Sequence, residues 1–459
     1  MLSTCSLIAV LIGTAHAETQ SEPTATTVTI PYEKYTLENG LEVILAEDHS
    51  IPSVQVNLWY RVGSKDEVEG RTGFAHLFEH LMFQGSEHND GEYFTPLQAI
   101  GARINGTTNF DRTNYFEQVP SEYLPLALWL ESDRMGWLLP VLDEAKLENQ
   151  KLVVRNERRQ SYENRPYGQV RMWLYETLYP EEHPYHVPTI GRHEDIDAAT
   201  LEDVSEFFQT WYGPNNASLS ICGDFDFLEA RELVETYFGS IPRGPTPEPA
   251  TPQTVQTVTL TEETVLRKED DVPHDKVWIA WLTPRWYGQG DADLDIISSV
   301  LSSGKESRLY SHLVHDLQIA RSINAYQASS LLQSVYIIEA TAATGHTTDE
   351  IVAQVDAVLH QLRTRGPTEE EVQTAIVNWE SGFFDDLSSI WNKGDRLNMY
   401  NVVHGDPGWI GNDLARYQAV TATSALNTVQ TWLPPDRRVV LHVTPAPTET
   451  PETTEESGR

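Results

Sequence analysis

The sequence contains very little cysteine and, beyond its first residues, no long apolar run. Cys5 and Cys222 are the only two cysteines among 459 residues, so a small scaffold stapled by disulfides is excluded. Cys222 comes just before Gly223 at the end of a predicted strand, and we interpret it as a buried small apolar residue, not a nucleophile. No stretch has the length and apolar character that a membrane span requires.

Basic residues are also scarce. The chain has 32 Lys and Arg against 68 Asp and Glu, which gives a net charge of -36. Because a surface of this sign repels nucleic acid and attracts cationic ligands, we expect no nucleic-acid partner. We favour solubility or a salty habitat as the reason for the acidity. The remaining composition, with 40% hydrophobic residues, is typical of a soluble globular protein.

Residues 1–17 have the pattern of a signal peptide. An apolar run from Leu7 to Ile12 precedes Ala15-His16-Ala17, a small-x-small cleavage site. No Lys or Arg precedes the run, which suggests that the true start codon lies elsewhere. Cleavage would remove Cys5 and leave no pair of cysteines to form a disulfide. We therefore expect an exported protein, in the periplasm of a Gram-negative bacterium.

Prolines mark a boundary between two halves of the chain. Five of them fall between Ile241 and Pro252, so we predict a linker at residues 242–256. It would join an amino-terminal domain, 27–241, to a carboxy-terminal domain, 257–444. Residues 445–459 are rich in Pro, Thr and Glu and are predicted to form a disordered acidic tail.

Both halves mix strand and helix patterns, which predicts an α+β fold. In the first half we expect strands at 35–45, 54–62 and 219–221, a hairpin at 102–119, and helices at 72–85, 123–139, 143–162 and 201–212. In the second half we expect strands at 277–282 and 335–340, and helices at 294–301, 309–317, 348–363 and 369–390.

The segment His76-Leu77-Phe78-Glu79-His80 carries the clearest chemistry. Its two histidines are one helical turn apart, a spacing that lets two residues of one helix bind the same metal ion, and Glu79 can face that ion without binding it. The order H-x-x-E-H is the inverzincin signature, in which a carboxylate takes the proton from a metal-bound water. The simpler alternative is a helix whose polar groups are solvated or paired. The apolar neighbours from Phe74 to Phe83 argue against it, because burying three ionisable groups is costly unless they bind something.

A third ligand is needed to hold zinc with one open position. On the predicted helix 143–162, Glu157 follows Val153 and Val154 by four and three residues, on the apolar side. A carboxylate placed there is more often functional than solvated.

With these residues in place, the chain resembles the pitrilysin/insulinase zinc peptidases, in particular their processing-peptidase-like branch. The 76 residues between His80 and Glu157 match that family's spacing. Similar segments surround the site, at 153–160, 183–185, 212–216 and 222–224. The resemblance implies two homologous domains, each an antiparallel-rich sheet packed with helices, that form half of a clamshell chamber. It also implies a zinc endopeptidase with one Zn²⁺ per chain, in which His76, His80 and Glu157 bind the ion and Glu79 is the general base.

Three further positions take roles from the same resemblance. Asn105 and Gly106 match the edge strand to which the substrate peptide adds, although the family more often has Ala where Gly106 stands. Gln150 occupies the position of a glutamate that hydrogen-bonds a metal ligand in many relatives. Gln can still form a hydrogen bond but carries no charge, so the zinc affinity or its pH dependence is expected to differ.

One departure concerns the second half. Self-sufficient relatives have an Arg and, seven residues later, a Tyr that stabilise the oxyanion. Counting from Ser307-Arg308-Leu309, these positions hold Val314 and Arg321 here, and Arg308 is expected to be structural. We therefore expect a heterodimer in which a related subunit without the zinc motif supplies the Arg and Tyr. The alternatives are a non-catalytic assembly subunit and a zinc hydrolase that acts on non-peptide bonds.

Overall fold

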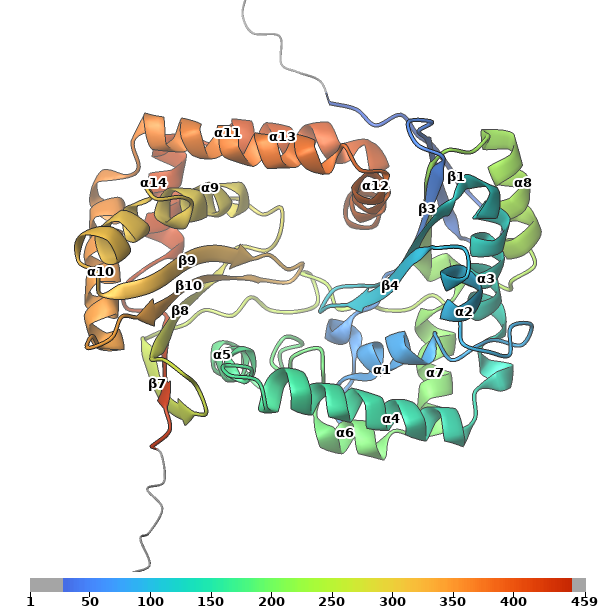
Figure 1. Ribbon diagram of the computed structural model, residues 1–459, viewed down its shortest axis with the longest axis horizontal. Coiled ribbons are helices and arrows are strands. Elements are labelled where there is room, and N and C mark those ends of the chain that lie inside the picture. The colour runs from blue at the N-terminus through green and yellow to red at the C-terminus, as the bar shows by residue number, and fades with distance from the viewer. Residues whose placement is uncertain (1–27, 448–459) are drawn as a thin grey trace, which may run out of the picture.

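The computed structural model describes residues 28–447. The chain forms two sheets, each covered by helices, as predicted for an α+β fold, and the two halves lie side by side (Figure 1). The predicted signal peptide and the part of the predicted tail beyond residue 447 lie outside the described residues. In the described part, no helix has the length and apolar character needed to cross a membrane.

The first sheet has six strands in the order β1-β2-β6-β3-β5-β4. Their bounds are β1 Glu33–Thr36, β2 Glu42–Glu47, β3 Ser53–Tyr60, β4 Arg103–Thr108, β5 Thr113–Pro120 and β6 Ala217–Gly223. All neighbours pair antiparallel except β2 and β6. The prediction of one strand at 35–45 was wrong, because the chain turns between β1 and β2, with Gly40 at a φ of +96°.

The first half has eight α-helices in the described residues, and the sequence predicted four of them, at 72–85, 123–139, 143–162 and 201–212. The eight helices are α1 Phe74–Leu81, α2 Phe94–Gln98, α3 Leu124–Trp137, α4 Glu144–Arg158, α5 Val170–Leu178, α6 His193–Ala198, α7 Leu201–Trp211 and α8 Phe227–Phe238. A π-helical turn, Arg159–Glu163, continues α4. Helices α1, α3, α7 and α8 pack with one face of the sheet in a single apolar core.

The second sheet has five strands in the order β7-β11-β8-β10-β9. The strands are β7 Thr264–Asp270, β8 Lys276–Thr283, β9 Ala320–Ala328, β10 Ser334–Ala342 and β11 Val439–Pro445. The helices are α9 Asp291–Ser302, α10 Thr348–Arg365, α11 Glu369–Asp386, α12 Ile390–His404, α13 Ile410–Gln418 and α14 Ala422–Trp432, with a π-helical turn at Tyr310–Asp316. The helix predicted at 369–390 ends at Asp386, and α12 begins after Ser389.

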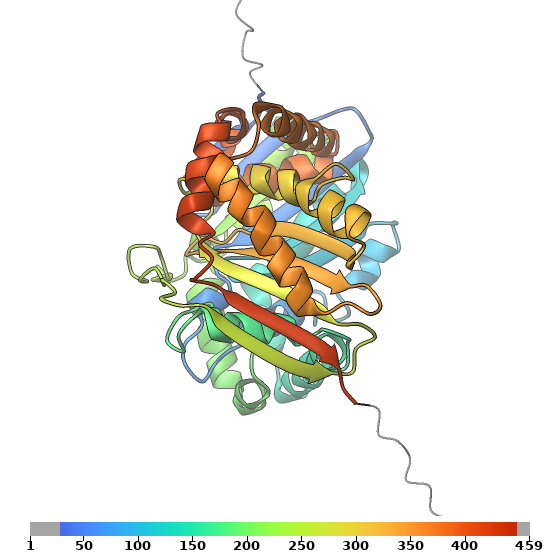
Figure 2. The ribbon, with the colours of Figure 1, turned by 90° about the vertical axis from the view of Figure 1, so that its left-hand side faces the viewer.

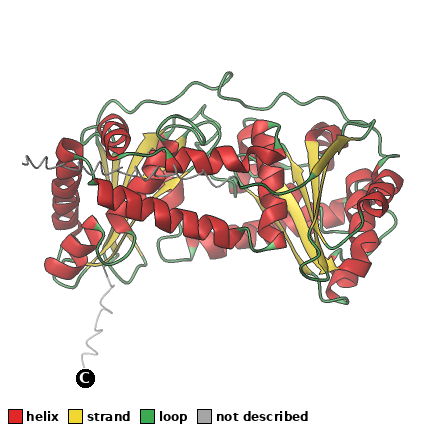
Figure 3. Ribbon diagram, turned by 90° about the horizontal axis from the view of Figure 1, so that it is seen from above, coloured by secondary structure: helices red, strands yellow, loops and turns green. Residues whose placement is uncertain are grey.

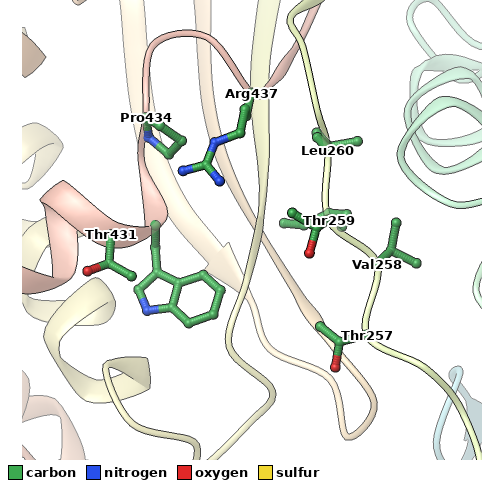
Figure 4. Close-up of a pocket in the computed structure, with 9 residues that line it drawn as sticks. Thr257, Val258, Thr259, Leu260, Thr431, Pro434 and Arg437 are labelled. Carbon is green, nitrogen blue, oxygen red and sulfur yellow. The ribbon is translucent and has the colours of Figure 1, made fainter.

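The chain between α8 and β7 forms neither helix nor strand and contains the predicted linker. Figure 3 shows this long coil crossing from one half to the other. Its last part borders a cavity of about 120 Å³ beside the end of α14. In Figure 4, Thr257 to Leu260 line one side, and Thr431, Pro434 and Arg437 line the other.

One helix from each half packs on the sheet of the other half. Helix α12 covers the outer face of β3 and β6, where Cys222 packs with Ile390 and Leu397. The amide of Asn398 on α12 donates to the carbonyl oxygen of Asn57 at 2.6 Å. In return, α5 packs on β8 and β11 in a cluster that includes Leu174. Figure 2 shows the second sheet with α10 in front of it and green helices of the first half below.

This exchange explains why the outer face of the first sheet can be polar and still be buried. Asn57, Ser218 and Ser220 alternate with core residues along β3 and β6 and are fully covered. Cys222 is buried, and burial raises the pKa of its thiol to about 12, which agrees with its interpretation as a small apolar residue.

Candidate metal centre

Helix α1 is held at its start by a half-buried carboxylate. Glu67 accepts hydrogen bonds from the backbone N–H groups of Gly73 and Ala75, both at 2.8 Å. These are N–H groups that no earlier turn of the helix can satisfy. Thr72, the first residue of the helix predicted at 72–85, lies outside α1: its hydroxyl donates a hydrogen bond to Asp195, and the cap position is Gly73.

The structure brings His76, His80 and Glu157 together. One ligand atom from each lies within 4.8 Å of the others. Helix α1 supplies the histidines, and α4 packs beside it and supplies Glu157 (Figure 1). On α4, Val154 is buried one turn before Glu157, whereas Val153 is 39% exposed, so only one of the two valines marks the apolar side.

The spacing of the donor atoms fits a tetrahedral zinc ion. The Oε2 atom of Glu157 lies 3.7 Å from Nε2 of His76 and 3.3 Å from Nε2 of His80. Ligand atoms bound at about 2.1 Å around a tetrahedral ion are about 3.4 Å apart. Both distances exceed those of ordinary N–H···O hydrogen bonds, which are about 2.7–3.2 Å. Two imidazoles and one carboxylate are also the donors that zinc prefers, with a fourth position open.

The electrostatic environment favours the protonation states of His76 and Glu157 that can bind a metal cation. Burial, with help from the neighbouring His80, lowers the pKa of His76 to about 4. Contact with the His80 imidazole lowers the pKa of Glu157. A neutral imidazole beside an ionised carboxylate is the state from which both can bind metal.

Glu79 lies on the same helix but outside this cluster of three. Its Oε2 atom accepts a hydrogen bond of 2.6 Å from the hydroxyl of Thr108 on β4. Burial raises the pKa of Glu79, while the Thr108 hydroxyl acts in the opposite direction. The carboxylate is therefore oriented by the strand next to the helix.

Strand β4 ends the first sheet and has β5 as its one neighbour. Asn105 on this edge is exposed, whereas Gly106 is buried. A Cβ at Gly106 would come within 3.1 Å of the rings of Phe83 and Tyr115. This close approach gives a steric reason for glycine where the family more often has alanine.

Gln150 is buried on α4, two turns before Glu157. Within residues 28–447, no hydrogen bond joins its side chain to the cluster, and Nδ1 of His76 is buried without a partner. The structure thus places Gln150 on the helix that carries Glu157 but does not show the contact expected from the resemblance.

The positions expected for an oxyanion pair serve other purposes. Val314 packs against the core of the second half, and Arg321 is exposed on β9, bonded to the hydroxyl of Thr344 at 2.7 Å. Arg308 forms a double hydrogen bond to the carboxylate of Glu371, at 2.7 Å for each contact, in agreement with a structural role.

Two residues of the site were missed by sequence reasoning. Thr108 fell inside a predicted strand, but its contact with Glu79 depends on how that strand meets the helix. Glu67 is nine residues before His76, too far upstream to be recognised as a local helix cap.

Two family models match the chain, one to each half. The insulinase (peptidase family M16) model matches residues 42–188, and the peptidase M16 inactive domain model matches residues 198–378. The chain belongs to the insulinase (M16) family of peptidases.

Individual relatives agree with this assignment. The chain is 29% identical to the zinc protease PqqE of Helicobacter pylori over 360 residues, which cover 78% of this chain and 80% of that protein. It is 24% identical to the uncharacterized zinc protease YmxG of Bacillus subtilis, over 81% of this chain and 88% of the relative.

Solved structures show the same fold. A protease from Helicobacter pylori aligns with a TM-score of 0.83 and 25% identity, over 90% of this chain and 100% of that one. Pitrilysin aligns with a TM-score of 0.74 and 17% identity, over 93% of this chain but only 46% of pitrilysin. The chain therefore corresponds to one half of that larger molecule, as predicted for half of a clamshell.

Proposed function

We propose that this protein is a zinc-dependent endopeptidase that hydrolyses peptides or unfolded segments. His76, His80 and Glu157 would hold the ion and Glu79 would act as general base. The observation that carries the proposal is the meeting of three metal-binding atoms within 4.8 Å, with a separate, oriented carboxylate on the same helix. Family membership and relatives named zinc proteases support it.

Different residues of the chain would carry out different steps of hydrolysis. Zinc bound here would polarise the scissile carbonyl and acidify a water molecule. Strand β4 offers the free edge, at Asn105 and Gly106, to which an extended peptide can add by backbone hydrogen bonds. Glu79, held by Thr108, takes the proton from the attacking water and passes it to the leaving amine.

We further propose that a related subunit completes the site. Within this chain, Val314 and Arg321 replace the Arg and Tyr expected from the resemblance, and Val314 is a partly buried residue packed against the core of the second half. The partner would bring the missing pair to face the metal centre. Export through residues 1–17 to a periplasm belongs to the same proposal and rests on the leader pattern.

A non-catalytic assembly subunit is the second candidate. The match of the second half to a domain named inactive favours it, whereas the complete set of His76, Glu79, His80 and Glu157 favours an enzyme.

Replacement of Glu79 by Gln separates these two candidates. Purified full-length chain, alone and with its related subunit, is assayed on unstructured peptides while the bound zinc is measured. A peptidase loses about 10²-fold or more of its rate in the Glu79→Gln variant and keeps its zinc. An unchanged rate refutes the general base, and the absence of any zinc-dependent cleavage by either preparation supports the assembly subunit. Full activity of the chain alone would refute the need for a partner.

A further inference from the structure

A cavity of about 500 Å³ lies directly beside the candidate metal centre. Its walls come from the end of α4, the loop that leads to α5, and strands β8 and β10 of the other half. Glu157 is one of the lining residues. A group bound in this cavity would therefore be next to the metal ligands and in contact with both halves of the chain.

Cations outnumber acids in the lining. Arg165, Arg171 and Lys276 face two carboxylates, Glu157 and Glu339. Glu157 is directed to the histidines, and Glu339 accepts a hydrogen bond of 2.8 Å from Nε1 of Trp278. None of the three cations forms a salt bridge with an acid of residues 28–447. Arg165 and Arg171 are exposed and Lys276 is half-buried, so a chain of net charge -36 presents three neighbouring cations without acidic partners to a ligand of opposite charge.

Aromatic rings hold two of these cations without neutralising them. The Nζ atom of Lys276 lies 4.9 Å from the ring centre of Tyr167 and 5.0 Å from that of Trp278. The Cζ atom of Arg171 lies 5.3 Å from the ring centre of Phe110 and 5.4 Å from that of Tyr175. Cation–π contacts of this kind restrict a side chain while leaving its hydrogen-bond donors available.

The loop that carries the site is also anchored to the second half. The Tyr167 hydroxyl donates a hydrogen bond of 2.6 Å to the carbonyl oxygen of His274, and Tyr167 itself has a φ of +62°. Such a backbone conformation persists only where surrounding contacts impose it. The cavity is therefore preformed, which reduces the entropy lost on binding.

We propose that this cavity is a substrate subsite for a carboxylate close to the scissile bond, with Arg171 and Lys276 as specificity-determining residues. Guanidinium and ammonium groups bind carboxylates through charge-assisted hydrogen bonds. The carboxylate is either an Asp or Glu side chain or the carboxy terminus of a peptide. This assignment rests on the proposed peptidase function. It gives the enzyme a local preference for acidic peptides, opposite to the preference for cationic ligands expected from its net charge.

Peptide binding to the full-length, zinc-loaded Glu79→Gln protein tests the assignment without consuming the peptide. The probes are fluorescein-labelled peptides of one neutral sequence, measured by fluorescence anisotropy. One arm replaces successive Gln residues by Glu, one at a time, in the amidated peptide. The other arm compares the amidated neutral peptide with its free acid. We expect one arm to contain a peptide that binds about tenfold more tightly than the neutral amide, which identifies the source of the carboxylate.

Arg171→Gln and Lys276→Gln, each made in the Glu79→Gln protein, are expected to remove this gain and to leave binding of the neutral amide unchanged. Lys268→Gln is the matched control, because Lys268 also lies over a ring, with its Nζ atom 5.4 Å from the centre of Trp173, but lies outside the cavity. It should keep the full gain.

The carboxylate subsite is overturned if all peptides bind equally tightly. It is also overturned if the higher affinity for the carboxylate-bearing peptide persists in both Arg171→Gln and Lys276→Gln. If wild-type protein still cleaves those peptides, the peptidase function stands without it. If no preparation of the wild-type protein cleaves any peptide while the charge-dependent binding persists, the peptidase function fails and the carboxylate site remains.

Discussion

Thr108 on strand β4 donates a hydrogen bond of 2.6 Å to Oε2 of Glu79 on helix α1. This bond joins the strand proposed to receive the substrate to the carboxylate proposed to accept the proton. We expect Thr108→Val, which keeps the shape of the side chain but removes the donor, to lower kcat about tenfold through misorientation of Glu79. Steady-state kinetics on an unstructured peptide, with zinc content measured in parallel, tests this expectation.

The control for this substitution is Thr108→Ser, which retains the hydroxyl and should retain most of the activity. Zinc content should be the same in all three proteins, because Thr108 does not contact the metal-binding cluster. A Thr108→Val protein as active as wild type would show that the bond has no role in orienting Glu79.

Removal of the metal should lower thermal stability. Zinc bound by His76, His80 and Glu157 stabilises the folded state in proportion to its affinity and free concentration. We expect a chelator to lower the melting temperature by several degrees and added zinc to restore it. The His80→Ala protein should have the same melting temperature without additions, with chelator and with added zinc. If the melting temperature of wild type is likewise insensitive to chelator and zinc, the cluster does not bind the ion tightly.

Local sequence patterns were sufficient for the elements that form the site. The H-x-x-E-H spacing and its apolar neighbours predicted helix α1, and the hairpin predicted at 102–119 is observed as the antiparallel pair β4 and β5. The position of Glu157 on its helix indicated a functional carboxylate, and the structure places it beside both histidines. The fold class, two helix-covered sheets, was also predictable from the alternation of patterns.

Contacts between segments distant in the sequence were not predictable in this way. The exchange of α5 and α12 between the halves depends on tertiary packing, and nothing in the pattern of Ile390 to His404 indicates which sheet it covers. Glu67 caps α1 from outside the helix, so no rule based on neighbouring residues identifies it. The turn at Gly40 did have a local signal, Asn39-Gly40, which a long apolar pattern obscured.

The unpartnered Nδ1 atom of His76 gives a prediction for Gln150. A carboxylate at this position, two turns before Glu157 on α4, could accept a hydrogen bond from Nδ1 and make the imidazole a better ligand. We expect Gln150→Glu to bind zinc about tenfold more tightly in a competition with a chromogenic chelator. Asn149→Asp is the control, since it adds the same charge at an exposed neighbouring position of the helix. Equal zinc affinities in both variants would exclude a contact between residue 150 and His76.

Gly394 allows α12 to approach the first sheet. A Cβ at this position would lie 1.9 Å from Oε1 of Gln55 and 3.2 Å from Cβ of Cys222. We expect Gly394→Ala to lower the free energy of unfolding by about 1–3 kcal/mol, measured by urea denaturation. Gln55→Ala in the same chain should recover part of this loss. Gly382→Ala on α11 has open space around its Cβ, so it should leave stability unchanged or raise it slightly. Equal effects of the two alanines would mean that helix propensity, not contact with Gln55, decides the outcome.

Asp295 on α9 should make stability depend on pH. Burial, together with the nearby Asp291, raises its pKa from 3.8 to about 7, and it accepts a hydrogen bond of 2.7 Å from the Tyr417 hydroxyl. Arg416 and Asp413 are the other charged groups that act on it. Because the folded state holds this proton more tightly than the unfolded chain does, Asp295 lowers stability as pH rises from about 4 to about 7 and adds no further change above that.

Asp295→Asn cannot lose a proton, so its free energy of unfolding should fall less than that of wild type between about pH 5 and about pH 8. Urea denaturation at both pH values measures the difference. Asp385→Asn, at an exposed position near the end of α11, should retain the wild-type decline. If the Asp295→Asn protein declines as steeply as wild type, another buried acid is responsible, and Asp291, whose pKa burial also raises, is the next residue to replace.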